Sequence, residues 1–185
     1  IVGKYGTMVQ NVLKKAAAMP WVAELSEVKQ RFIQETLCDF RENGADLTDE
    51  QKVRFTEIST KLAMLSQSFG ERVLDSTNAW EYVTADPNEL VGMPESAKEN
   101  ARQDALAKGY GTEEEPQWRF SLQFTSIQPV LTYADNEALR SRIWHAVNAK
   151  CTGEHDTTEL IQEILTLRAE KAAMLGYEKY SDYVT

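Results

Sequence analysis

The sequence predicts a mainly α-helical fold, built of antiparallel helical hairpins, that carries one short two-stranded β ribbon. Apolar residues recur at three- and four-residue steps over most of the chain, which is the period of an amphipathic helix. Two short segments are instead rich in aromatic and β-branched residues, as strands are. With 42% hydrophobic and 26% charged residues, and only 9 Gly and 5 Pro, the composition is typical of a folded helical protein.

The N-terminal part, residues 1–45, is predicted to form two helices. Residues 2–19 are mildly apolar, and Pro20 ends their helix because it lacks a backbone donor. Residues 21–43 follow as a second helix, with helically spaced positions at Val22, Leu25, Val28, Phe32, Thr36, Leu37 and Phe40. Gly44 is placed to close this helix in the left-handed conformation.

A long third helix is predicted to begin at Thr48. Thr48 and Gln51 have the spacing of a capping box, and Asp49 and Glu50 place negative charge in the first turn. The apolar positions then form one stripe: Phe55, Ile58, Leu62, Leu65, Phe69 and Val73. Two long helices on either side of Gly44 predict an antiparallel pair.

Two later segments, residues 79–84 and 118–124, are predicted to pair as a β ribbon. The first is aromatic and β-branched, and the second alternates strictly between apolar and polar residues. Its aromatic residues, Trp118, Phe120 and Phe124, are interpreted as core packing. Between the two segments, a polar helix is expected from Pro94 to Lys108, with Gly109 just past its end.

Two further helices are predicted in the C-terminal part. Asp135 or Asn136 can cap the first, which bears Leu139, Ile143, Ala146 and Val147. Asp156 with Glu159 can cap the second, which bears Leu160, Ile161, Ile164, Leu165 and Leu167 and ends at Gly176.

The length predicts a single helical domain or fragment over residues 1–185, divided into the N-terminal helices 1–45 and the remainder 46–185. The chain starts at Ile1 without an initiator Met and stops shortly after a helix start, so we expect it to be a piece of a longer protein. Such a piece would expose apolar surface, which predicts self-association or marginal stability.

Charge and cysteine content exclude several classes of protein. A formal charge of −9 would repel nucleic acid and anionic lipid, so neither is an expected partner. No apolar run approaches the roughly 18–20 residues of a membrane helix, which predicts a soluble protein. Two cysteines, Cys38 and Cys151, are too few for a disulfide framework, and a reducing, cytoplasmic compartment is expected.

A search for catalytic chemistry finds only weak candidates. The chain contains two histidines, His145 and His155, and lacks the His-Glu-x-x-His motif of zinc hydrolases. Together with Cys151 and with Glu154 or Glu159 they could surround a zinc ion, but the spacing matches no strong pattern, and solvated loop residues are the favoured interpretation. We therefore predict no catalytic and no metal-binding residue in this chain, and no substrate-binding residue can be named.

Other kinds of site receive no support from the sequence. A nucleophile elbow and a Gly-rich loop that opens a helix are both absent. Three consecutive glutamates, Glu113, Glu114 and Glu115, lie in a loop over residues 110–116 that is predicted to be mobile. Such a run is ordinarily a solvated surface rather than an acid–base pair.

Several segments form an ordered pattern that is more specific than any single motif. They are LAMLSQSFGERVLDSTNAW at residues 62–80, ELVGMPES at 89–96, PVLTYADN at 129–136, LRAEKA at 167–172, LGY at 175–177 and YSDY at 180–183. In this order they closely resemble the thimet-oligopeptidase and oligopeptidase A family of zinc metallopeptidases. The resemblance covers roughly residues 47–185, whereas residues 1–45 are similar only in helical character.

The resemblance implies a function that this chain cannot perform by itself. In that family a His-Glu-x-x-His helix and a later glutamate hold the zinc, and all of them lie C-terminal to the matched region. The implied role is the helical wall of a deep channel that admits short peptides and excludes folded proteins. The chain would end before the catalytic zinc domain, be inactive alone, bind no zinc, and have the remaining catalytic part of the same polypeptide as a partner.

Two alternatives stay open from the sequence. Thr125-Ser126-Ile127-Gln128 stands where close oligopeptidase A relatives tend to have Pro-Ser-Tyr, and the pair Gln128-Pro129 looks more like the dipeptidyl carboxypeptidases. The segments YADN at residues 133–136 and LDST at 74–77 look more like the endopeptidases, so a dipeptidyl carboxypeptidase is the close competitor. The other alternative is a non-catalytic helical module that binds a partner helix or peptide. A downstream His-Glu-x-x-His in the parent reading frame would favour the peptidase, and an early stop codon would favour the module.

Overall fold

The computed structural model describes residues 4–185, which form two compact units. The first consists of residues 4–66 together with residues 160–185, and the second of Gln67–Glu159. The fold is mainly helical, as predicted, with one two-stranded antiparallel sheet among the described residues. Every helix within residues 4–185 is too short or too polar to cross a membrane.

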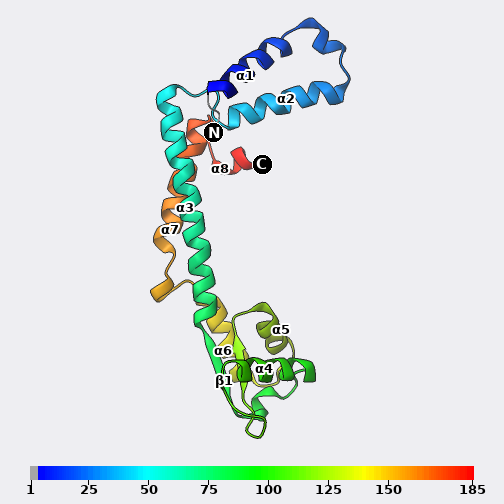
Figure 1. Ribbon diagram of the computed structural model, residues 1–185, viewed down its shortest axis with the longest axis vertical. Coiled ribbons are helices and arrows are strands. Elements are labelled where there is room, and N and C mark those ends of the chain that lie inside the picture. Colours follow the sequence, from blue (N-terminus) through cyan, green and yellow to red (C-terminus); the bar gives the residue numbers. More distant parts are fainter. Residues whose placement is uncertain (1–3) are drawn as a thin grey trace. The chain divides into compact units, whose positions relative to one another are not determined.

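A helical hairpin opens the first unit. It consists of α1 (Lys4–Ala17), a 3-10 turn η1 (Pro20–Glu24) and α2 (Glu27–Glu42), and α1 and α2 run side by side in opposite directions (Figure 1). Gln10 is buried in α1 and donates from Nε2 to Asp46 Oδ1 at 2.9 Å. Lys14 Nζ contacts the same oxygen at 2.5 Å, and its hydrogen bond holds the pKa of Asp46 below the usual value.

The second predicted helix begins later than expected. Residues 21–43 were predicted to be helical throughout, but Pro20–Glu24 forms a separate 3-10 turn, and Ser26 precedes α2 in an extended conformation. The break is stabilised by Gln30, whose Nε2 donates to the main-chain oxygen of Leu25 at 2.8 Å. The Ser26 side chain makes no capping hydrogen bond, so the non-helical backbone of Ser26 and the Gln30 contact define the boundary.

The left-handed conformation of Gly44 and the capping box at Thr48 are confirmed. Gly44 has φ +82°, and the Thr48 and Gln51 side chains each accept a hydrogen bond from the other's main-chain N–H, at 3.3 and 3.0 Å. The expected antiparallel pairing of α2 with the next helix, α3 (Asp49–Ala79), is wrong: α2 packs against α1 instead. Asp46 lies in the connection between α2 and α3, and Gln10 and Lys14 of α1 bind its carboxylate. These contacts hold α1 beside the end of α2, which explains why α2 pairs with α1.

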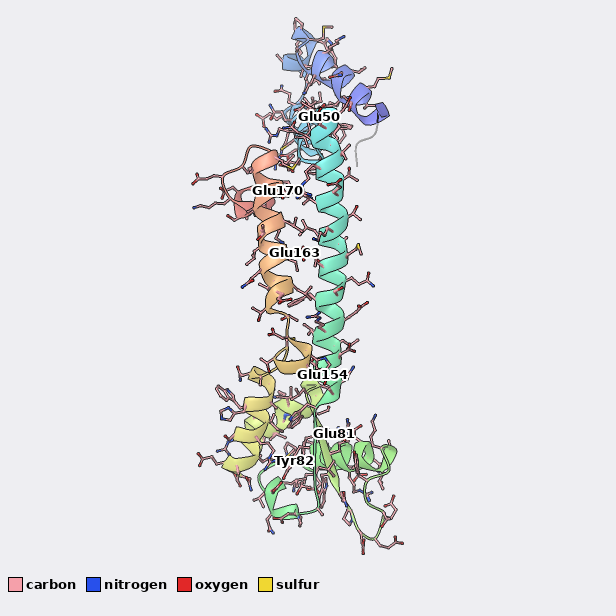
Figure 2. The ribbon with its side chains drawn as sticks, turned by 90° about the vertical axis from the view of Figure 1, so that its left-hand side faces the viewer. Glu50, Glu81, Tyr82, Glu154, Glu163 and Glu170 are labelled. Atoms are coloured by element: carbon pink, nitrogen blue, oxygen red, sulfur yellow. The ribbon has the colours of Figure 1, made fainter. Side chains whose placement is uncertain are left out.

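The part of α3 in the first unit is paired with α7 (Thr158–Met174), which runs in the opposite direction and is followed by α8 (Tyr180–Val184). The Arg54 guanidinium makes two hydrogen bonds to Glu170, at 2.7 and 2.8 Å, and Lys61 forms an ion pair with Glu163. Figure 2 shows both glutamates on α7 beside α3. On α3, Ile58 lies between Arg54 and Lys61 in the sequence and is completely buried.

A Thr48→Ala variant is expected to lose about 1 kcal/mol of folding free energy, because the N-cap hydroxyl of α3 disappears. The matched control is Thr166→Ala in α7, since the exposed Thr166 hydroxyl only donates to the Gln162 carbonyl of the same helix. That change should stay within roughly 0.5 kcal/mol of the parent chain. Urea unfolding followed by circular dichroism measures both, and equal losses would contradict the cap.

The second unit is organised around the predicted ribbon. Strands β1 (Glu81–Thr84) and β2 (Trp118–Ser121) are antiparallel, with Glu81 opposite Ser121. The other elements of the unit are η2 (Pro87–Leu90), α4 (Glu95–Ala107), α5 (Phe124–Tyr133), α6 (Glu137–Asn148) and η3 (Gly153–His155). Their buried core consists of Leu90, Met93, Ala101, Phe120, Val130, Ala134, Leu139 and Ile143.

The expected strand over residues 118–124 is too long. The strand ends at Ser121, and Phe124 begins helix α5, which was not predicted. The Phe124 side chain is 77% exposed, so the prediction that Phe124 packs in the core is wrong. Pro129 lies inside α5, and this usual helix breaker conceals the helix in the sequence. For Phe120, which is 1% exposed, the core interpretation is confirmed.

Four predicted helix boundaries after residue 94 are confirmed to within a few residues. Gly109, at φ +83°, follows the Lys108 cap of α4, and Gly176, at φ +85°, follows α7. Asn136 caps α6 by accepting from the Leu139 N–H at 2.9 Å. Asp156 accepts from the Thr158 N–H at 2.8 Å at the start of α7. The segment 110–116 is a loop, and its mobility stays a prediction.

Candidate functional site

The larger cavity of the second unit lies between α4, β2 and the start of α5. It has a volume of about 790 Å³, and its lining includes Asn100, Asp104, Lys108, Arg119, Phe120 and Gln123. We call it the α4–β2 pocket. Amide and hydroxyl groups make up most of its polar lining, which suits neutral hydrogen-bonding ligands better than ions.

The charged centre of the α4–β2 pocket is already neutralised by protein groups. The Arg119 side chain is 9% exposed and contacts Glu81 at 2.6 Å and Asp104 at 2.5 Å. Hydrogen bonds from Tyr110 and then Arg119 hold the pKa of Glu81 below its usual value. Arg119 therefore joins the ribbon to α4, and a buried cation paired in this way is a structural element rather than a receptor for an anion.

A second cavity, of about 590 Å³, contains both histidines of the chain. Its lining includes Trp80, Arg142, His145, Lys150, Glu154 and His155, and we call it the histidine pocket. His145 lies on α6, while Glu154 and His155 belong to η3 (Figure 2 labels Glu154). The pocket is thus formed where the chain folds back after α6.

The turn that follows α6 depends on Cys151, which has φ 60° although it is not glycine. Left-handed backbone costs a non-glycine residue roughly 1–2 kcal/mol, so surrounding contacts must hold it. Its N–H donates to Ser76 Oγ at 2.9 Å. The two neighbours of Cys151, Lys150 and Thr152, both line the histidine pocket as a result.

The structure brings together only part of the zinc set considered from the sequence. His145, Glu154 and His155 line one pocket, whereas Cys151 and Glu159 are not among its lining residues. Within residues 4–185 no group of three or more His, Cys, Asp or Glu side chains has an arrangement that could hold a metal ion. A catalytic zinc takes about three protein ligands and an open position, so these residues do not fit one.

The glutamate run is part of the surface, and no acid–base pair forms there. The Glu113 carboxylate is an ion-pair partner of Arg102 at 2.7 Å, with 70% of its side chain exposed. The sequence did not single out Arg142, Lys150 or Trp80 as site residues. The only local signal was the three-residue spacing of Arg142 and His145 on one helix face.

Comparison with known proteins identifies relatives of this chain. The profile of Peptidase family M3 matches residues 130–185. Oligopeptidase A of Haemophilus influenzae is 36% identical over 166 residues, which are 86% of this chain and 24% of that protein. The organellar oligopeptidase A of Arabidopsis thaliana is 35% identical over 177 residues, or 94% of this chain and 22% of that protein.

A dipeptidyl carboxypeptidase is also related. The Escherichia coli enzyme of that name is 29% identical over 140 residues, or 75% of this chain and 20% of that protein. The chain thus spans at most about a quarter of the length of these curated relatives. The ordered segments, the helical fold with its ribbon and these matches place the chain among the relatives of oligopeptidase A in peptidase family M3.

Proposed function

We propose that this chain is the N-terminal channel-wall region of an intracellular zinc metallo-oligopeptidase that hydrolyses peptide bonds in short peptides. The observation that carries the proposal is the 36% identity to an oligopeptidase A over 86% of the chain. The proposed zinc is held by residues outside this chain, as the resemblance to the oligopeptidase family implies. Short peptides and the remaining catalytic part of the polypeptide are the proposed partners.

The role of a wall is supported by how the helices are stabilised. In the first unit, α3 and α7 are joined by ion pairs at two levels, Arg54 with Glu170 and Lys61 with Glu163. In the second unit, α4, α5 and α6 enclose one buried core with the ribbon. Packed helices of this kind resist deformation, which a steric filter for folded proteins requires.

The proposal is tested with the longer protein encoded by the same reading frame and with the 185-residue chain alone. We expect the longer protein to cleave a fluorogenic peptide, to lose this activity with a chelator, and to leave a folded protein intact. We expect the chain alone to bind no stoichiometric zinc and to cleave nothing, because a zinc hydrolase needs its complete ligand set. Metal analysis and peptide turnover are the two measurements.

Two outcomes would replace the proposal. Chelator-sensitive turnover by the chain alone, lost in His145→Ala, would make it a small metallopeptidase. A longer protein without turnover would favour a non-catalytic helical interaction module, which is the alternative from another class. Within the family, release of dipeptides from the C-terminus of a peptide would identify a dipeptidyl carboxypeptidase, an alternative favoured by the 29% identity to that enzyme.

A further inference from the structure

The cations of the second unit differ in whether they have a protein partner. Most of them reach a carboxylate or a main-chain oxygen: Arg72, Lys98, Arg102, Arg119 and Arg140. Within the part of the chain that the structure describes, Lys108, Arg142 and Lys150 make no hydrogen bond or ion pair. Arg142 and Lys150 both line the histidine pocket. Two cations that have no such partner among the described residues therefore line one pocket of a chain whose formal charge is −9.

Arg142 lies over the ring of Tyr82, and this contact leaves the N–H groups of its guanidinium free. Its guanidinium carbon lies 4.3 Å from the centre of the Tyr82 ring, and Tyr82 donates from its hydroxyl to Glu89 at 2.9 Å. Burial, together with this hydrogen bond, raises the pKa of Tyr82 above its ordinary value, so the ring stays neutral. A cation–π contact uses the face of the guanidinium and none of its N–H groups, which remain available to an anion.

Lys150 is brought to the pocket by the strained return after α6. It precedes Cys151, whose left-handed backbone is held by the hydrogen bond to Ser76. Strained non-glycine backbone is concentrated at ligand-binding sites, where it fixes a side chain in place. Glu154 is the one carboxylate that lines this pocket in the described residues, so the permanent charges of the lining favour an anion.

The remaining lining gives the pocket an apolar side. The half-buried Trp80 is one of the lining residues, and Ala79, Leu122 and Ala146 add aliphatic surface. Arg142 is itself exposed, and its guanidinium can form a charge-assisted hydrogen bond to a carboxylate at the mouth of the pocket. The apolar lining residues give room to an apolar side chain next to that carboxylate.

We propose that the histidine pocket binds a carboxylate of a peptide, with Arg142 and Lys150 as its charged partners and Trp80 against the adjoining side chain. That the ligand is a peptide rests on the proposed function, whereas the preference for a carboxylate rests on the pocket itself. The carboxylate comes either from the C-terminus of the peptide or from an acidic side chain, and the chemistry of recognition is the same.

The test uses the full-length protein and fluorescent peptides whose N-methylated bonds resist cleavage. One peptide has neutral side chains and a free C-terminal carboxylate, the second is its C-terminal amide, and the third is that amide with one internal glutamate. Fluorescence anisotropy gives the dissociation constants. We expect at least one carboxylate peptide to bind about tenfold more tightly than the neutral amide, and the one that does so identifies the source of the carboxylate.

Arg142→Gln and Lys150→Gln test the two proposed partners separately. Each should remove most of the tenfold preference while leaving the affinity for the neutral amide unchanged. The matched control is Lys108→Gln, because Lys108 is also without a partner among the described residues but lines the α4–β2 pocket. This control should keep the full preference, and unchanged melting temperatures show that the variants are folded.

The inference is overturned if the preference is absent, or if it survives in both variants. It is equally overturned if Lys108→Gln reduces the preference as much as they do, because a general effect of charge would then explain the result. These outcomes are separate from a failure of the proposed function. The protein could show no peptidase turnover and still prefer carboxylate peptides in a way that depends on Arg142 and Lys150. In that case the carboxylate-binding pocket would stand, and the proposed peptidase function would be wrong.

Discussion

A Gly92→Ala variant is expected to lose about 3 kcal/mol or more of folding free energy, because two separate effects oppose the new methyl group. Gly92 has φ +87°, a conformation that residues with a side chain rarely adopt. A Cβ at this position would also lie 2.4 Å from the Tyr133 carbonyl oxygen and 2.8 Å from the Asp135 carboxylate. Real Cβ atoms do not approach a main-chain oxygen so closely.

The backbone around Gly92 has little freedom to move away. Leu90 and Met93 are buried on either side, and the N–H of Asp135 donates to the Val91 carbonyl at 2.8 Å. That hydrogen bond joins the turn after η2 to the connection between α5 and α6. A shift that relieved the contact would therefore disturb the core of the second unit.

Gly109→Ala is the matched control for this prediction. Gly109 has φ +83°, but a Cβ there would meet no heavy atom within 4 Å. This variant should lose about 1 kcal/mol of folding free energy, which is the cost of the left-handed backbone for a residue with a side chain. Thermal unfolding of the 185-residue chain measures the difference, and Gly92→Ala should lower the melting temperature by roughly 6–12 °C. Equal losses in the two variants would show that the close approach of Tyr133 is unimportant.

Local signals in the sequence were sufficient wherever a structural feature depends on neighbours a few residues away. The cap at Thr48, the left-handed Gly44 and the cap at Asn136 all follow from side chains within four residues of one another. The existence of the ribbon was also predictable, although the alternation over residues 118–124 extended its second strand beyond Ser121. These features need no knowledge of the rest of the chain.

Features that depend on distant residues could not be predicted in the same way. The partner of α3 is α7, and Arg54 and Glu170 are separated by 116 residues. Nothing in the period of either helix specifies which other helix covers its apolar stripe. Helix α5 is stable despite Pro129 because Val130, with no exposed surface, is anchored in the core. Tertiary packing there overrides a local signal that ends most helices.

The candidate site was unpredictable for the same reason. His145 and His155 share no helix face, yet both line the histidine pocket because the chain turns sharply at Cys151. A positive φ at a cysteine has no sequence signal, since it is imposed by the hydrogen bond to Ser76 on another element. Trp80 reaches the pocket from the end of α3, far from the histidines in sequence. Only the folded chain brings these residues together.

A Phe120→Ala variant is expected to lose about 3–5 kcal/mol, because it removes a large side chain from the centre of the second unit. Phe120 is 1% exposed and packs with the apolar residues of η2, α5 and α6. The cavity left behind is costly since the ribbon and three helices surround it and cannot all close inward. Such a loss is a large part of the roughly 5–15 kcal/mol that stabilises an ordinary domain.

Phe124→Ala is the decisive comparison, because strict alternation over residues 118–124 gives Phe120 and Phe124 the same expected role. In the structure Phe124 is the first residue of α5 and is 77% exposed, so its substitution should change stability by no more than roughly 0.5 kcal/mol. Urea unfolding followed by tryptophan fluorescence reports mainly on the second unit, which contains Trp80, Trp118 and Trp144. Similar losses for the two variants would restore the longer strand and contradict the start of α5, whereas a loss confined to Phe120→Ala places the end of the ribbon at Ser121.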